Sequence, residues 1–114
     1  FPKVNPNETI SKTLIEISEK GLGITAIIDE NQKLKGVFTD GDLRRCLNKQ
    51  IEIHTTKISS VMTTKGKTIS ETALAIDAIN QMQKFEIYIL IALNAKGKPV
   101  GVLRMHDLMQ AGLV

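Results

Sequence analysis

The sequence has few aromatic side chains and a single cysteine. Tryptophan is absent, and the 114 residues include one tyrosine and three phenylalanines, so the aromatic platform of a single-strand nucleic-acid binder is missing. The lone Cys46 cannot form an internal disulfide, which is typical of a reducing compartment and predicts a cytoplasmic location. Because Cys46 stands among apolar and basic residues of an expected helix, we predict a buried structural thiol rather than a nucleophile.

Long apolar runs and blocks of like charge are also missing. No stretch approaches the roughly 20 apolar residues needed to span a bilayer, so we expect no membrane insertion. The net charge is +3, from 15 basic and 12 acidic residues spread along the chain. This is a weak indication of anionic partners, and we expect no nucleic acid among them. The chain starts at Phe1 without a leader pattern, and we interpret it as a fragment of a longer protein.

The sequence contains an internal repeat. Thr-Ile-Ser occurs at 9–11 and again at 68–70, an offset of 59, whereas GVFTDGDL (36–43) aligns with GVLRMHDL (101–108) at an offset of 65. The six extra residues of the second copy predict a longer helix there. Each copy is too small to bury its own apolar face, so the two copies are expected to pack on each other.

Both copies predict the same order of elements: an extended segment, a helix, two strands and a second helix. In the first copy we expect Ser11 as the N-cap of a helix that stops at Gly21. In the second copy Ser70 is expected to begin the helix. The remaining expectations are helices at 12–20, 41–49 and 106–111, strands at 24–29, 34–38, 87–94 and 99–103, and an apolar helix stripe of Ala75, Ile76, Ile79 and Met82.

Tandem units of this order, each ending in Gly-apolar-apolar followed by a polar turn and Asp-apolar, resemble a pair of CBS domains, also called a Bateman module. The resemblance implies an α/β (α+β) fold of two repeats packed with pseudo-twofold symmetry. We expect repeat 1 at 1–50, a linker at 51–60 and repeat 2 at 61–114.

A narrower resemblance concerns the segments GLGITAIID, GVFTDGDLRR and HDLMQAGLV. They are similar to the C-terminal half of bacterial D-arabinose 5-phosphate isomerases, which make the precursor of 3-deoxy-D-manno-octulosonate (Kdo), a lipopolysaccharide sugar. In that family catalysis belongs to an upstream sugar-isomerase (SIS) domain. The resemblance therefore implies a regulatory module without catalytic residues of its own.

The segment GVFTDGDLRR has two interpretations. Thr39 and Asp42 fit a capping box, which satisfies backbone N–H groups at a helix start and needs no ligand. Gly41 would also let a neighbour approach closely, free amides at a helix start favour anions, and the following arginines add positive charge. A capped helix start can also be a phosphate-binding site, so both interpretations stay open.

The CBS resemblance implies specific ligand contacts in a cleft between the repeats. The matching Thr touches phosphate or ribose, and the matching Asp accepts hydrogen bonds from the ribose diol. In the second copy Arg104 replaces the Ser or Thr, so its capping box is expected to be lost and two equivalent sites are not expected. The candidate ligand-binding residues are Thr39, Asp40, Gly41, Asp42, Arg44, Arg45, Arg104, His106 and Asp107.

Other kinds of site are less favoured. His54, His106 and Cys46 lack metal-ligand spacing, no nucleophile has a base beside it, and the four methionines are expected to fill core or interface. We expect no metal and no required cofactor. Three functions stay open: a sensor of CMP-Kdo or an adenine nucleotide, a ligand-free oligomerisation module of the same isomerase, and, least favoured, another anion binder. Self-association as a dimer or tetramer is expected from the apolar positions at 73–82 and 105–111.

Overall fold

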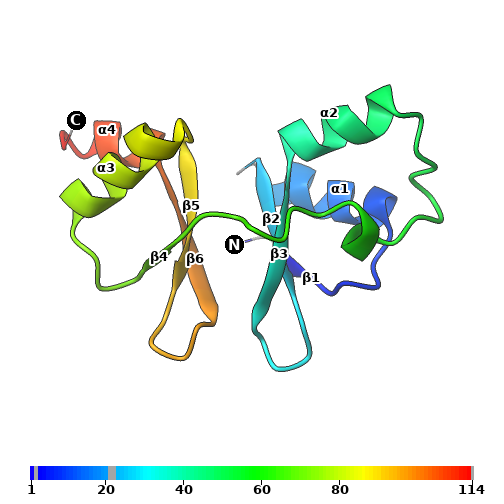
Figure 1. Cartoon of the computed structure of the whole chain (residues 1–114), viewed down its shortest axis with the longest axis horizontal. Coiled ribbons are helices and arrows are strands. Elements are labelled where there is room, and N and C mark those ends of the chain that lie inside the picture. The colour runs from blue at the N-terminus through cyan, green and yellow to red at the C-terminus, as the bar shows by residue number, and fades with distance from the viewer. Residues whose placement is uncertain (2, 21–22, 114) are drawn as a thin grey trace. The chain divides into compact units, whose positions relative to one another are not determined.

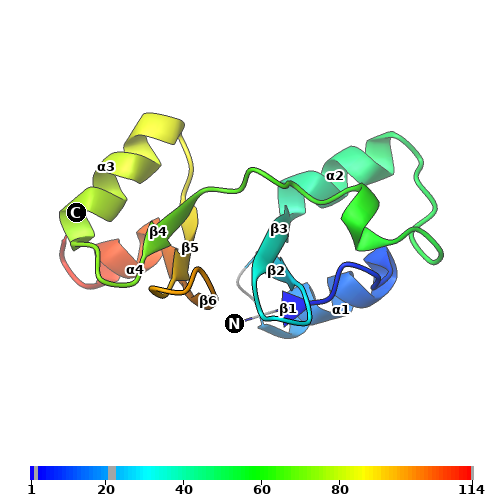
Figure 2. The ribbon, with the colours of Figure 1, turned by 60° about the horizontal axis from the view of Figure 1, so that its bottom comes forward.

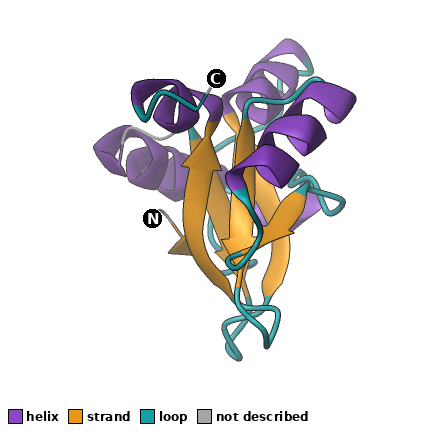
Figure 3. Ribbon diagram, turned by 90° about the vertical axis from the view of Figure 1, so that its left-hand side faces the viewer, coloured by secondary structure: helices purple, strands orange, loops and turns teal. Residues whose placement is uncertain are grey.

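The chain folds into two compact units, as seen in a computed structural model that describes residues 1, 3–20 and 23–113 (Figure 1). Unit 1 comprises Phe1–Gly66 and unit 2 comprises Lys67–Val114. Both combine helices with a small three-stranded sheet, which confirms the predicted mixed α/β fold (Figure 3).

Unit 1 has the strand order β1-β2-β3. Its strands are β1 (Lys3–Val4), β2 (Ile24–Ile28) and β3 (Leu34–Thr39), and its helices are α1 (Ile10–Lys20) and α2 (Asp40–Asn48). Strand β1 is parallel to β2, and β2 is antiparallel to β3. The two helices cover one face of the sheet (Figure 2), where Ile10, Ile27 and Phe38 are fully buried. Every residue of β2 is buried, which explains why its sequence ITAII carries no charged residue and only one polar one, Thr25.

The segment that follows α2 completes unit 1. Ile58, in the short 3-10 helix η1 (Ile58–Ser60), is fully buried and belongs to the same core cluster. Thr63 pairs with Val37 of β3 through two backbone hydrogen bonds of 2.9 Å. Residues 51–60, expected to be a linker, therefore supply apolar side chains and backbone hydrogen bonds to unit 1.

Unit 2 repeats this plan with the strand order β4-β5-β6. Its strands are β4 (Thr68–Ser70), β5 (Ile89–Leu93) and β6 (Pro99–Arg104), and its helices are α3 (Ala75–Phe85) and α4 (Met105–Gln110). The core contains Ala78, Ile79, Met82, Leu90 and Leu108. The hairpin β5–β6 keeps the same antiparallel register, including a bulge, as β2–β3.

The two units correspond at a constant offset of 65 residues. Helix α1 begins at Ile10 and α3 at Ala75, and both contain 11 residues; β3 and β6 begin at Leu34 and Pro99. The predicted offset of 59 for Thr-Ile-Ser and the longer second helix were therefore wrong. The first Thr-Ile-Ser lies at a helix start, and the second forms strand β4 because it pairs with β5.

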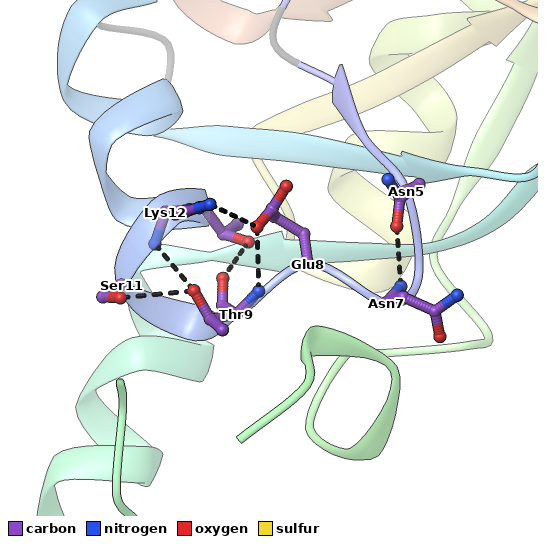
Figure 4. A network of polar contacts seen from close by, with 7 residues as sticks. Asn5, Asn7, Glu8, Thr9, Ser11 and Lys12 are labelled. Atoms are coloured by element: carbon purple, nitrogen blue, oxygen red, sulfur yellow. Dashed lines mark hydrogen bonds and ion pairs between the residues drawn. The ribbon is translucent and has the colours of Figure 1, made fainter. Parts of the chain in front are cut away.

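Three local predictions about the first helix of each repeat also change. Helix α1 begins one residue before Ser11, and Thr9 caps it: the Thr9 hydroxyl accepts from the Lys12 N–H at 3.3 Å (Figure 4). Ser70 ends a strand instead of starting a helix. Ile76, part of the predicted apolar stripe, is 56% exposed, whereas Ala78, outside that stripe, is buried. The predicted stop at Gly21 lies outside the described residues.

Candidate ligand-binding site

The site in unit 1 lies where β3 ends and α2 begins. Thr39 is the N-cap: its hydroxyl accepts a hydrogen bond from the Asp42 N–H at 3.3 Å, and the Asp42 carboxylate accepts from the Thr39 N–H at 2.9 Å. This is a capping box, which ties down two backbone groups at the helix start. The predicted capping box between Thr39 and Asp42 is therefore confirmed.

Asp42 makes more contacts than a cap requires. Its carboxylate is 4% exposed, and it also accepts hydrogen bonds from the Thr39 hydroxyl at 3.1 Å, from the Thr63 hydroxyl at 2.9 Å and from the Arg45 guanidinium. A carboxylate offers about four acceptor positions, so all of them are filled. Arg45 is the partner most easily displaced, because its side chain is 64% exposed.

The surroundings of this carboxylate mix both signs of charge. Asp40 is exposed at the first position of α2, and Arg44 is exposed one turn later. A Cβ added at Gly41 would lie 3.6 Å from the Thr39 hydroxyl, an ordinary contact, so packing does not explain the glycine. Beside the helix a hollow of about 230 Å³ is bordered by residues that include Asp42, Arg45, Lys49 and Ser60.

Sequence reasoning missed Thr63, Lys49 and Ser60. Thr63 reaches Asp42 from 21 positions away, and neither the cap motif nor the repeat signals this contact. Lys49 borders the hollow one helical turn beyond Arg45, and this spacing is the signal that could have added it to the basic cluster.

The corresponding helix start in unit 2 is held differently. Asp107 accepts from the Arg104 N–H at 3.1 Å, so half of the capping box persists, contrary to our expectation that it is lost. An arginine side chain cannot accept from the Asp107 N–H. It instead donates to the carboxylate from Nε at 3.2 Å and from Nη2 at 2.9 Å.

This ion pair changes the acidity of both partners. The Arg104 hydrogen bonds lower the pKa of Asp107 below its ordinary value, and the pKa of Arg104 is raised by the same contact. His106 is exposed on the first turn of α4. The nine predicted residues thus form two clusters: Thr39, Asp40, Gly41, Asp42, Arg44 and Arg45 in unit 1, and Arg104, His106 and Asp107 in unit 2.

Cys46 lies one turn after Asp42 and is 3% exposed. Burial raises the pKa of its thiol, and the Asp42 carboxylate raises it further. A neutral buried thiol is a poor nucleophile, so Cys46 contributes packing, as predicted. Among the described residues, no group of three or more His, Cys, Asp or Glu side chains could hold a metal ion.

Within the described part of the chain, no helix combines the length and the apolar character needed to cross a membrane.

Comparison with known proteins identifies a family and a curated relative. A CBS domain family model matches residues 1–49 and 58–113. Over all 114 residues the chain is 42% identical to the arabinose 5-phosphate isomerase KdsD of Pseudomonas aeruginosa, of whose length it covers 35%. The chain therefore spans about a third of the length of this curated relative.

Two solved structures share the fold. The CBS domain protein PAE2072 from Pyrobaculum aerophilum, complexed with AMP, superimposes with a TM-score of 0.87 at 18% identity, covering 98% of this chain and 89% of that one. The CBS domain pair of protein MJ0100, in complex with 5′-methylthioadenosine and S-adenosyl-L-methionine, gives a TM-score of 0.86 at 20% identity, with coverages of 97% and 86%. Since the family model matches both repeats and the capped helix starts recur in both units, this chain belongs to the CBS domain family and contains a tandem pair.

Proposed function

We propose that this CBS pair is the ligand-sensing regulatory module of a D-arabinose 5-phosphate isomerase and responds to a nucleotide or nucleotide-sugar. The identity to KdsD over the whole chain supports the choice of enzyme. The catalytic SIS domain is expected in the part of the protein upstream of this chain, and the isomerisation itself belongs there. A cytoplasmic location is part of the same proposal.

The observation that carries the binding proposal is the Asp42 carboxylate. It is buried and fixed at a helix start, yet one of its four partners is the exposed Arg45. A ribose diol can donate two hydrogen bonds to one carboxylate. We expect one hydroxyl of the diol to replace the Arg45 contact, which frees that guanidinium for an anionic group of the same ligand.

Charge at the helix start sets what else the ligand carries. The N–H groups at the start of α2 favour an anion, whereas the exposed carboxylate of Asp40 opposes one. Arg44, the released Arg45 and Lys49 together exceed that negative charge. A ligand with a phosphate and a second anionic group therefore fits better than one with a phosphate alone.

CMP-Kdo has this combination, because it carries a ribose diol, one phosphate and the carboxylate of the sugar. AMP supplies the first two groups and lacks the carboxylate. Feedback control also needs a signal from beyond the regulated step, and an activated product of the later pathway is such a signal. We therefore propose CMP-Kdo as the preferred effector, with an adenine nucleotide as the weaker ligand. Arg104 is not among the residues proposed to contact the sugar carboxylate, because its guanidinium is hydrogen-bonded to Asp107.

A thermal-shift screen of nucleotides and sugar nucleotides tests this proposal. A ligand present at 100 times its Kd stabilises the folded chain by about 2.7 kcal/mol. At equal ligand concentrations the ligand with the lower Kd stabilises more, so CMP-Kdo is expected to raise the Tm more than AMP. Asp42→Asn, with folding checked by circular dichroism, is expected to weaken binding by roughly 1–3 kcal/mol. An unchanged Tm with every nucleotide and sugar nucleotide would contradict the binding proposal.

A second candidate, a ligand-free assembly module, is favoured by one specific observation. Unit 2 exposes apolar side chains of which Leu74 is 67%, Ile76 56% and Met109 60% exposed. Exposed apolar groups that lie together mark interaction sites, and Ile76 and Met109 belong to helices α3 and α4, which contact each other. The two candidates differ in the screen above, because an assembly module would show self-association without any ligand-dependent shift.

A further inference from the structure

Two equivalent glycines have opposite surroundings. Gly36 of β3 and Gly101 of β6 occupy the same position in the two units. A Cβ at Gly36 would lie 2.8 Å from the Met62 sulfur and 2.9 Å from the Thr63 carbonyl oxygen. A Cβ at Gly101 would meet nothing within 4 Å. Among the described residues, the neighbour that makes a glycine necessary is thus present in unit 1 only.

That neighbour is the segment 57–63, which covers unit 1. The Ile58 N–H donates to the Glu8 carbonyl at 2.7 Å, the Ser59 N–H donates to the Pro6 carbonyl at 3.1 Å, and Thr63 pairs with Val37. We refer to residues 57–63 as the covering segment. It buries Ile58 completely and brings Met62 against the core.

Unit 2 has a groove where unit 1 has its covering segment. Its volume is about 370 Å³, and its lining includes Glu71, Ala73, Leu74, Gly101 and Val102. At the offset of 65 these residues correspond to Pro6, Glu8, Thr9, Gly36 and Val37, the contacts of the covering segment. Within the described residues, no backbone pairing at Val102 corresponds to that between Val37 and Thr63. The groove therefore has the lining and the open strand edge that suit an extended apolar segment.

We infer that the residues immediately upstream of Phe1 in the full-length protein occupy this groove. The CBS family match to the second repeat starts at residue 58, so the covering segment of unit 1 is the leading segment of repeat 2. By the same offset, the leading segment of repeat 1 falls just before Phe1. In the KdsD relative, residues upstream of the matched region are available to form such a segment, since this chain covers 35% of that protein and matches its C-terminal region. In this arrangement the leading segment of each repeat packs on the unit that contains the rest of the other repeat.

The groove also specifies the chemistry of its occupant. Small side chains at Ala73, Ala78 and Ala92 line it, and they leave room for branched or long apolar groups. In unit 1 such groups are supplied by Ile58 and Met62. The upstream segment is expected to carry two apolar side chains at this spacing and to pair its backbone with Val102.

Hydrogen exchange followed by mass spectrometry tests the inference on the full-length protein and on the 114-residue chain. We expect amides of β6 to exchange more slowly in the full-length protein than in the 114-residue chain. Strand β3, already covered, is the internal control and is expected to exchange equally in both. Equal exchange of β6 in the two proteins would overturn the inference. Protection of β6 in the 114-residue chain that grows with protein concentration would also overturn it, since the occupant would be a second copy.

Gly101→Val provides an independent test, with Gly36→Val as its matched control. In the 114-residue chain Gly101→Val is expected to leave the Tm unchanged, because the site is open. In the full-length protein it is expected to displace the upstream segment and return β6 to fast exchange. Gly36→Val is expected to destabilise unit 1 in both proteins. Gly101→Val without effect on β6 exchange in the full-length protein would show that the groove holds no upstream segment.

Discussion

The Thr63 hydroxyl donates a 2.9 Å hydrogen bond to Oδ1 of Asp42, 21 residues earlier in the chain. The contact joins the covering segment of unit 1 to the helix start that forms the candidate site. A movement of the covering segment that breaks this contact would therefore remove one donor from a buried carboxylate. This contact makes Thr63 a positioning residue for Asp42.

Thr63→Val is expected to destabilise the chain by about 1–3 kcal/mol, the cost of removing one donor from a buried charged acceptor. Valine keeps the shape of threonine, so the packing term is small. Thr64→Val is the matched control, because Thr64 is exposed and its substitution is expected to change stability by less than about 0.5 kcal/mol. Urea denaturation followed by circular dichroism measures both, and equal stability of the two variants would contradict the prediction.

The ionisation of Asp107 depends on Arg104. Hydrogen bonds from Arg104 lower the pKa of Asp107 below the ordinary 3.8. Because the folded-state pKa is lowered, this contribution to stability is present above the unfolded pKa and is lost as the pH falls through the folded value. Arg104→Gln is expected to raise the pKa of Asp107 toward its ordinary value, as measured by NMR titration of the carboxyl carbon.

Asp29 is the internal control for this titration. Its pKa is lowered chiefly by the backbone hydrogen bond from Lys33, and also by that from Asn31, so Arg104→Gln is expected to leave it unchanged. An Asp107 pKa that does not respond to Arg104→Gln would show that the ion pair is not populated in solution.

Thr25 on β2 is fully buried, and its hydroxyl has no hydrogen-bond partner among the described residues. A buried unpaired hydroxyl costs free energy that a methyl group does not. Thr25→Val is therefore expected to stabilise the chain by about 1 kcal/mol. Thr13→Val is the matched control: Thr13 is equally buried, but its hydroxyl donates to the Thr9 carbonyl at 2.9 Å, so its loss is expected to destabilise. Thermal unfolding distinguishes the two, and a lower Tm for Thr25→Val would contradict the prediction.

Self-association through unit 2 is the fourth prediction. We expect a dimer or a larger oligomer by light scattering at high micromolar concentration. Ile76→Lys and Met109→Lys each place a charge on an exposed apolar surface, and each is expected to weaken association by roughly 1–3 kcal/mol. Ile15→Lys is the control, because Ile15 in unit 1 is 58% exposed. A monomeric mass for the unmodified chain would remove the prediction.

The sequence predicted best the elements whose pattern is strictly local. Strands β2 and β3 follow β-branched and apolar runs, and α2 follows the Thr39–Asp42 capping box, so their bounds came within one or two residues. The repeat was visible for the same reason, since its second half is well conserved between the two copies at 36–43 and 101–108.

What the sequence did not predict depends on partners distant in the chain. Thr-Ile-Ser suits either a helix start or a strand, and pairing of β4 with β5 decides the second case. Ile76 and Ala78 differ in burial although both suit a helix interior, because the direction of the α3 stripe is set by the sheet beneath it. The contact between Thr63 and Asp42 has no sequence signature, since the bonding groups come from segments with unrelated patterns.

Binding at Asp42 is measured most directly by isothermal titration calorimetry of the 114-residue chain with CMP-Kdo and with AMP. We expect saturable heat with both ligands, a lower Kd for CMP-Kdo, and binding weaker by on the order of tenfold or more in Asp42→Asn, equivalent to about 1.4 kcal/mol. Absence of heat with CMP-Kdo, or an Asp42→Asn chain that binds as tightly as the unmodified one, would contradict the proposal and leave Thr39 and Asp42 as a helix cap alone.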